Sequence, residues 1–191
     1  MEYNDHKVIE LRMRHKRETS LDLEQGVSIN GERLNFQRQL LFDEQLSILL
    51  PETFQIMSVE IAKIKYPSEQ RPQLIYTNSD GSVNYTFSLL DVPVDQSQLT
   101  EIRDGFKNII KRIQPANIFY QEQEETLGDT VVAQFDFKNY GIDTQLYNLF
   151  YFTVLAGKLI HGIFNCPFQE RDTWQPIAQQ VIKSMLIEKQ K

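Results

Sequence analysis

The stretch TVVAQFDFK at residues 130–138 begins a series of alternating apolar positions. The series continues as TQLYNLFYFTVL at residues 144–155 and as LIHGIFNC at residues 159–166. A period of two residues is typical of β-strands, and the short segments between the runs contain the turn residues Asn139, Gly141 and Gly157. The three runs therefore predict a meander of antiparallel strands.

An amphipathic helix is expected directly after this meander. Its apolar residues recur at helical spacing and form one face, made of Trp174, Ile177, Ala178, Val181, Ile182 and Met185. Pro176 lacks an N–H group and therefore fits the first turn, where backbone donors are unpaired in any case. We predict a helix over residues 173–188, with Thr173 or Asp172 as the N-cap.

The residues before the meander predict the other elements of an α+β domain. A long amphipathic helix is expected at Leu99–Ile113, capped by Asp95 or Ser97, and a short helix after Ser58. Strands are expected near residues 32–42, 46–50, 73–77, 83–90 and 118–122. The sequence NSDG at residues 78–81 predicts a hairpin between two of them, and the acidic stretch 121–125 is expected to lie at a solvated hairpin tip.

Composition restricts the class of protein. The chain has 191 residues, 41% of them hydrophobic, and a formal net charge of −6, which argues against a general nucleic-acid binder. No run approaches the roughly 18 apolar residues of a membrane span, and residues 1–17 are too polar for a secretory signal. A single cysteine, Cys166, excludes an intramolecular disulfide framework. We therefore expect a cytoplasmic protein without a membrane span.

Residues 1–30 are predicted to form an N-terminal arm, and residues 31–191 a single α+β domain. The arm carries a basic cluster made of Lys7, Arg12, Arg14, Lys16 and Arg17. One interpretation is an electrostatic contact with an acidic partner. The other is a solvated terminus, either mobile or loosely docked.

Four segments carry a resemblance to a known family. They are LSILLP at residues 46–51, GKLIHGI at 157–163, WQPI at 174–177 and VIKSM at 181–185. With the order of elements, they resemble the PsbP-like superfamily over about residues 32–188. That superfamily includes PsbP of photosystem II, the Ran-release factor, DcrB-type proteins and chaperones of type VI secretion effectors. The resemblance implies an α/β/α sandwich, a twisted antiparallel sheet with helices on both faces. It also implies a protein that binds or scaffolds, but it does not choose the partner.

No catalytic, cofactor-binding or metal-binding residues are assigned. The nucleophile-elbow, P-loop and dinucleotide-binding motifs are absent from the sequence. His161 and Cys166 lie five positions apart on one predicted strand and should therefore face opposite sides of the sheet. Two functions remain: a non-catalytic protein-binding module of adaptor, scaffold or chaperone type, or a hydrolase or ligand-processing enzyme with a dispersed site.

The run at residues 144–155 is apolar at both parities, and one of its two rows is rich in tyrosine. Helices that cover both faces of the sheet would account for this pattern. Alternatively, the tyrosine-rich face is only partly covered and binds another polypeptide. On this second interpretation we predict that Tyr147, Leu149 and Tyr151 bind the partner. The partner could be a different protein or a second copy of this chain.

Overall fold

The computed structural model describes residues 21–29, 31–141 and 144–188. Its helical segments are η1 (Leu23–Gln25), α2 (Val59–Lys65), η2 (Gln96–Gln98), α3 (Leu99–Ile113), η3 (Phe168–Glu170) and α4 (Arg171–Lys183). Its strands are β1 (Val27–Ile29), β2 (Glu32–Leu34), β3 (Phe36–Leu41), β4 (Leu46–Pro51), β5 (Gln55–Ile56), β6 (Leu74–Thr77), β7 (Asn84–Pro93), β8 (Ile118–Leu127), β9 (Thr130–Tyr140), β10 (Gln145–Leu155), β11 (Lys158–Pro167) and β12 (Leu186–Ile187). The fold is α+β, as predicted.

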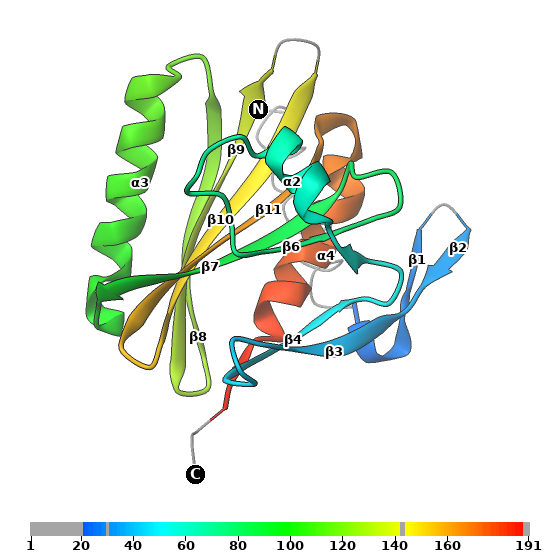
Figure 1. Ribbon diagram of the computed structural model, residues 1–191, viewed down its shortest axis with the longest axis horizontal. Coiled ribbons are helices and arrows are strands. Elements are labelled where there is room, and N and C mark those ends of the chain that lie inside the picture. Colours follow the sequence, from blue (N-terminus) through cyan, green and yellow to red (C-terminus); the bar gives the residue numbers. More distant parts are fainter. Residues whose placement is uncertain (1–20, 30, 142–143, 189–191) are drawn as a thin grey trace, which may run out of the picture.

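A seven-stranded antiparallel sheet forms the centre of the molecule, in the order β5-β6-β7-β11-β10-β9-β8 (Figure 1). The predicted meander is confirmed, because β10 pairs with β9 on one side and with β11 on the other. The predicted hairpin at residues 78–81 is also confirmed. It joins β6 to β7, and Gly81 adopts a φ of 76°, a conformation that glycine tolerates without steric cost.

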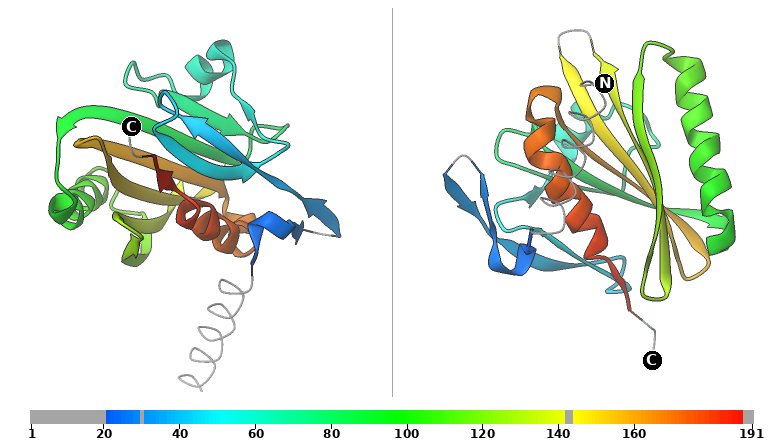
Figure 2. Two further views of the ribbon diagram at one scale, coloured as in Figure 1. Left: turned by 90° about the horizontal axis from the view of Figure 1, so that it is seen from below. Right: turned by 180° about the vertical axis from the view of Figure 1, so that it is seen from behind.

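Helices cover both faces of this sheet. Helix α3 contacts β9 and β10 on one face, and α4 contacts β11 on the other (Figures 1 and 2). A small sheet of order β12-β4-β3, which the sequence did not predict, shares the second face with α4. The α/β/α arrangement is therefore confirmed, with one outer layer built from both a helix and strands.

The two larger of three apolar clusters lie one on each side of the main sheet. Strand β10 contributes Tyr147, Leu149 and Tyr151 to the core under α4, and Phe152 to the core under α3. Alternate residues of one strand thus serve opposite faces, as the period of two requires. The interpretation that both faces of residues 144–155 are covered is the correct one.

Several predicted boundaries were wrong. The last helix begins at Arg171, after the 3-10 turn η3, so Pro176 lies inside it and not in its first turn. This helix ends at Lys183, because the chain then extends as β12 to pair with β4, Leu186 opposite Ser47. Strand β8 continues to Leu127, so the acidic stretch 121–125 lies in an edge strand rather than at a hairpin tip.

The described end of the predicted N-terminal arm is ordered against the domain. Residues 21–29 form η1 and β1, β1 pairs with β2, and Leu23 and Val27 are buried in the core under α4. The basic cluster from Lys7 to Arg17 lies outside the described residues. In the described ranges, no helix is long and apolar enough to cross a membrane.

Candidate functional site

The three residues predicted to bind a partner are part of the core. Tyr147, Leu149 and Tyr151 have exposed fractions of 0%, 1% and 0%. The Tyr147 hydroxyl donates to Asp136 Oδ2 at 2.9 Å, and the Tyr151 hydroxyl donates to the Thr86 carbonyl at 3.1 Å. The expected partly open tyrosine face is therefore wrong, because α4 and the small sheet cover it completely.

His161 and Cys166 face opposite sides of the sheet, as predicted. The His161 ring lies about 5 Å from the rings of Phe106, Phe150 and Phe152, with centroid distances of 5.0, 5.2 and 5.0 Å. Burial lowers the pKa of His161 to about 4, so the ring is neutral near pH 7. Cys166 is buried under α4, and burial raises the pKa of its thiol. Neither group is placed or charged as a catalytic pair would require.

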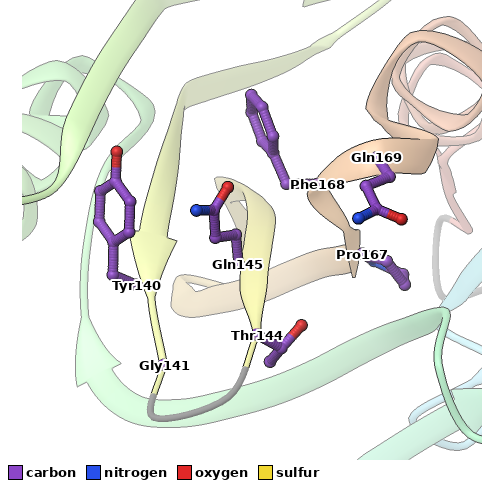
Figure 3. A pocket seen from close by; sticks show the side chains of 7 residues that line it. All are labelled: Tyr140, Gly141, Thr144, Gln145, Pro167, Phe168 and Gln169. Carbon is purple, nitrogen blue, oxygen red and sulfur yellow. The ribbon is translucent and has the colours of Figure 1, made fainter.

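A surface cavity of about 480 Å³ lies where β9, β10 and η3 come together (Figure 3). Figure 3 shows Tyr140 of β9, Gln145 of β10 and Phe168 of η3 projecting to the same side of the strand ends. The described residues that line it are Tyr140, Gly141, Thr144, Gln145, Pro167, Phe168 and Gln169. Among the described residues, this lining combines aromatic surface with two side-chain amides and two hydroxyls, and it contains no Asp, Glu, His or Cys.

A β-bulge shapes the surface beside this cavity. Phe119 pairs with Phe137 and Glu122 pairs with Phe135, so Tyr120 and Gln121 together face the single residue Asp136. The Asp136 side chain accepts a hydrogen bond from the Gln121 N–H at 2.7 Å, in addition to the one from Tyr147. Bulges redirect side chains, and here the bulge turns Tyr120 towards η3 and α4.

Aromatic rings and cations then alternate across this part of the molecule. The Phe168 ring stacks on the Tyr120 ring at a centroid distance of 6.5 Å and an interplanar angle of 15°. Lys138 Nζ lies 4.1 Å from the Phe168 centroid and 4.8 Å from the Tyr140 centroid. The Arg171 guanidinium lies 4.2 Å from the Tyr120 centroid. We call the set Tyr120, Lys138, Tyr140, Phe168 and Arg171 the Phe168 surface.

Both cations of the Phe168 surface lie over aromatic rings. Cation–π contact stabilises a cation but leaves its N–H donors available. Arg171 makes one contact of 3.9 Å with the exposed carboxylate of Asp172, a weak pair by its length and exposure. Within the described ranges, no carboxylate is paired with Lys138.

Sequence reasoning did not find the Phe168 surface. Its members come from β8, β9, η3 and α4, and they are brought together only by strand pairing and by the bulge. The one local signal is the spacing of Lys138 and Tyr140, which are two residues apart and therefore project from the same face of a strand.

Comparisons with solved structures show which known proteins share this fold. No family model and no curated protein sequence matches the chain. Among solved structures, the cyanobacterial PsbP protein (CyanoP) of Synechocystis sp. PCC 6803 superposes with a TM-score of 0.60 at 15% identity, over 85% of this chain and 98% of that one. The chain has a PsbP-like fold.

Two further solved structures share the fold, with somewhat lower TM-scores and similarly low sequence identity. LpqN of Mycobacterium tuberculosis, described as involved in cell envelope biogenesis, has a TM-score of 0.53 at 12% identity, over 86% of this chain and 99% of that one. A protein of Bacteroides thetaiotaomicron has a TM-score of 0.54 at 11% identity, over 81% of this chain and 49% of that one. At these identities the likeness concerns the PsbP-like fold and not what the proteins bind.

Proposed function

We propose that this chain is a non-catalytic protein-binding module, of adaptor, scaffold or chaperone type, that binds another polypeptide on the Phe168 surface. The observation that carries the proposal is the exposed aromatic stack beside a cavity. Tyr120 and Tyr140 have exposed fractions of 37% and 44%, although large aromatic side chains are usually well buried. Tyrosine and arginine are enriched at protein interfaces and often supply a large share of the binding energy.

The chemistry of the cavity favours binding over catalysis. General acid–base catalysis needs a group that gains or loses a proton near the working pH, most often histidine or a carboxylic acid. The described residues that line the cavity include no histidine and no carboxylic acid, and their amide and hydroxyl side chains are suited to hydrogen bonding with a peptide. The alternative of a hydrolase would have been favoured by His161 in a pocket, but His161 packs among phenylalanine rings under α3.

Site-specific crosslinking tests this proposal. The photoreactive residue p-benzoylphenylalanine is placed at Tyr140, and in a control at Ile113, which is 70% exposed on α3 on the other side of the sheet. After irradiation in the native host, position 140 should give a discrete crosslinked protein that position 113 does not give. A second copy of this chain in the crosslink would identify a homo-oligomer. Equal yields at both positions, or none at position 140, would contradict the proposal.

Affinity measurements then test the energetic role of the aromatic stack. Once the crosslinked partner is known, the double variant Tyr120→Ala/Tyr140→Ala should bind it about 30-fold more weakly, which corresponds to about 2 kcal/mol. Both side chains are exposed, so the variant should keep the circular dichroism spectrum of the unmodified protein. A folded variant with unchanged affinity would exclude the Phe168 surface as the binding site.

A further inference from the structure

Resting on the proposed function, we infer that the Phe168 surface recognises an acidic segment of its partner. In this arrangement, Asp or Glu carboxylates pair with Lys138 and Arg171, while a neighbouring apolar side chain enters the cavity beside Phe168. Two observations support it: the two cations lie over aromatic rings without a close carboxylate among the described residues, and the cavity beside them has an aromatic and amide lining.

Among the described residues, no carboxylate forms an ion pair with Lys138. Its ammonium group is held between the Phe168 and Tyr140 rings at 4.1 and 4.8 Å, and the side chain is partly buried. An ammonium group has three N–H donors, and the electron-rich face of a ring attracts the cation but accepts only a weak hydrogen bond. A carboxylate brought by a partner would therefore find both a charge and free donors at a fixed position.

Only some of the polar contacts that the Arg171 guanidinium group can make are formed. Its guanidinium lies over Tyr120 and 5.5 Å from the centroid of Tyr147, and its buried Nε has no hydrogen-bond partner among the described residues. A guanidinium presents its donors as a planar fork that matches a carboxylate in two hydrogen bonds. The rings hold this fork in place before any partner arrives, which reduces the entropy lost on binding.

Some other basic residues of the described chain form closer ion pairs with acids. Arg103 lies 2.7 Å from Asp104, Lys158 lies 2.9 Å from Asp91, and Lys183 lies 2.9 Å from Glu125. The chain has 26 acidic and 20 basic residues, so acids are in excess. The Phe168 surface thus brings together two neighbouring cations that both lie over aromatic rings.

The surroundings favour a peptide over other anionic partners. Two cations are fewer than the roughly four to eight that bind an anionic membrane surface, and the net charge of −6 opposes binding to nucleic acid. The cavity offers the rings of Tyr140 and Phe168 to an apolar side chain, and the amides of Gln145 and Gln169 to a peptide backbone. An acidic residue next to an aromatic one fits this combination.

A titration with matched peptides tests the inference directly. The probe is acetyl-Gly-Glu-Phe-Glu-Gly-amide, and the control replaces both Glu residues by Gln. In amide-resolved NMR spectra of the full chain, the acidic peptide should shift resonances of residues 138–141 and 168–171. It should bind at least about tenfold more tightly than the Gln peptide, and this advantage should shrink as salt is raised. Equal affinities, no shifts, or shifts confined to other surfaces would overturn the inference.

A charge-neutral variant provides the second readout. Lys138→Gln should weaken binding of the acidic peptide about tenfold and leave the Gln peptide unaffected. The matched control is Lys111→Gln, because Lys111 also lies over a ring, 5.3 Å from the Phe119 centroid, but on the α3 side and away from the cavity. An equal effect of the two substitutions would overturn the inference.

The crosslinked partner separates this inference from the proposed function. If that partner binds Lys138→Gln as tightly as the unmodified protein, the Phe168 surface is a binding site but does not recognise acids, and the inference fails alone. If position 140 gives no crosslink while the acidic peptide binds at residues 138–141, the carboxylate site stands and the protein-binding function fails. Mapping the crosslinked segment of the partner should show Asp or Glu within a few residues of the attachment point.

Discussion

The ring of Tyr151 lies directly over Gly162. The two residues are paired across β10 and β11, and a Cβ added at Gly162 would be 2.0 Å from Tyr151 Cζ. The ring is fixed there because its hydroxyl donates to Thr86 and its edge packs against Phe87, with a centroid distance of 6.1 Å. Glycine at position 162 is thus required by close approach of a side chain.

Gly162→Ala should destabilise the fold by about 1–3 kcal/mol, because a methyl group would have to displace a buried tyrosine. Urea denaturation measures the change. The control is Gly105→Ala in α3, where an added Cβ meets no atom within 4 Å. That substitution should stabilise the protein by about 0.5–1 kcal/mol through helix propensity. A Gly162→Ala variant within about 0.5 kcal/mol of the unmodified protein would show that the ring moves easily.

Trp174→Ala should reduce the free energy of unfolding by about 3–5 kcal/mol. The indole is buried against Phe54 and Phe164, at centroid distances of 5.9 and 6.4 Å, and its N–H donates to Glu170 at 3.0 Å. Its loss removes apolar contacts, opens a cavity and leaves an acceptor unpaired. Denaturation followed by circular dichroism is the suitable measurement, since Trp174 is the single tryptophan. A loss below about 1 kcal/mol would mean that the ring contributes little to the core.

Removing the Tyr147 hydroxyl should cost more than removing that of Tyr151. Both side chains are fully buried, but Tyr147 donates to the carboxylate of Asp136 and Tyr151 donates to a neutral carbonyl. Hydrogen bonds to ionised groups are about twice as strong as neutral ones. We expect losses of about 1.5–3 kcal/mol for Tyr147→Phe and about 1 kcal/mol for Tyr151→Phe. The reverse order in urea melts would contradict this account of Asp136.

His161 should make the fold less stable in mild acid. Its pKa is about 4 in the folded chain, because of burial, and about 6.5 in the unfolded chain. Between these values the unfolded state binds more protons, so stability falls as the pH drops from about 6.5 to about 4 and changes no further below that. The loss from this group should reach about 3 kcal/mol.

The measurement is the free energy of unfolding in urea at pH 7.5 and pH 4.5. His161→Phe keeps an aromatic ring among Phe106, Phe150 and Phe152 but cannot bind a proton. The variant should therefore lose about 2–3 kcal/mol less than the unmodified protein between the two pH values. Parallel losses in both proteins would assign the acid sensitivity to other groups.

The amino-acid sequence by itself determined the strands of the meander, the apolar face of α4 and the two-sided character of β10. These features follow from periodicity, because side chains two apart in a strand, or three to four apart in a helix, must share a face. The side chains of Trp174, Ile177 and Val181 could be assigned to one buried face in this way. The helix start could not, because Arg171 is joined to η3 without a side-chain cap.

Only the tertiary structure decided which faces are covered and where the exposed aromatic rings meet. Periodicity shows that Tyr147 and Tyr151 share a face, but it does not show that α4 and the small sheet bury that face. Likewise, Tyr120 and Phe168 are far apart in the chain and stack only because a bulge opposite Asp136 redirects one strand towards η3. Such contacts depend on packing between elements distant in sequence, and a local pattern carries no information about them.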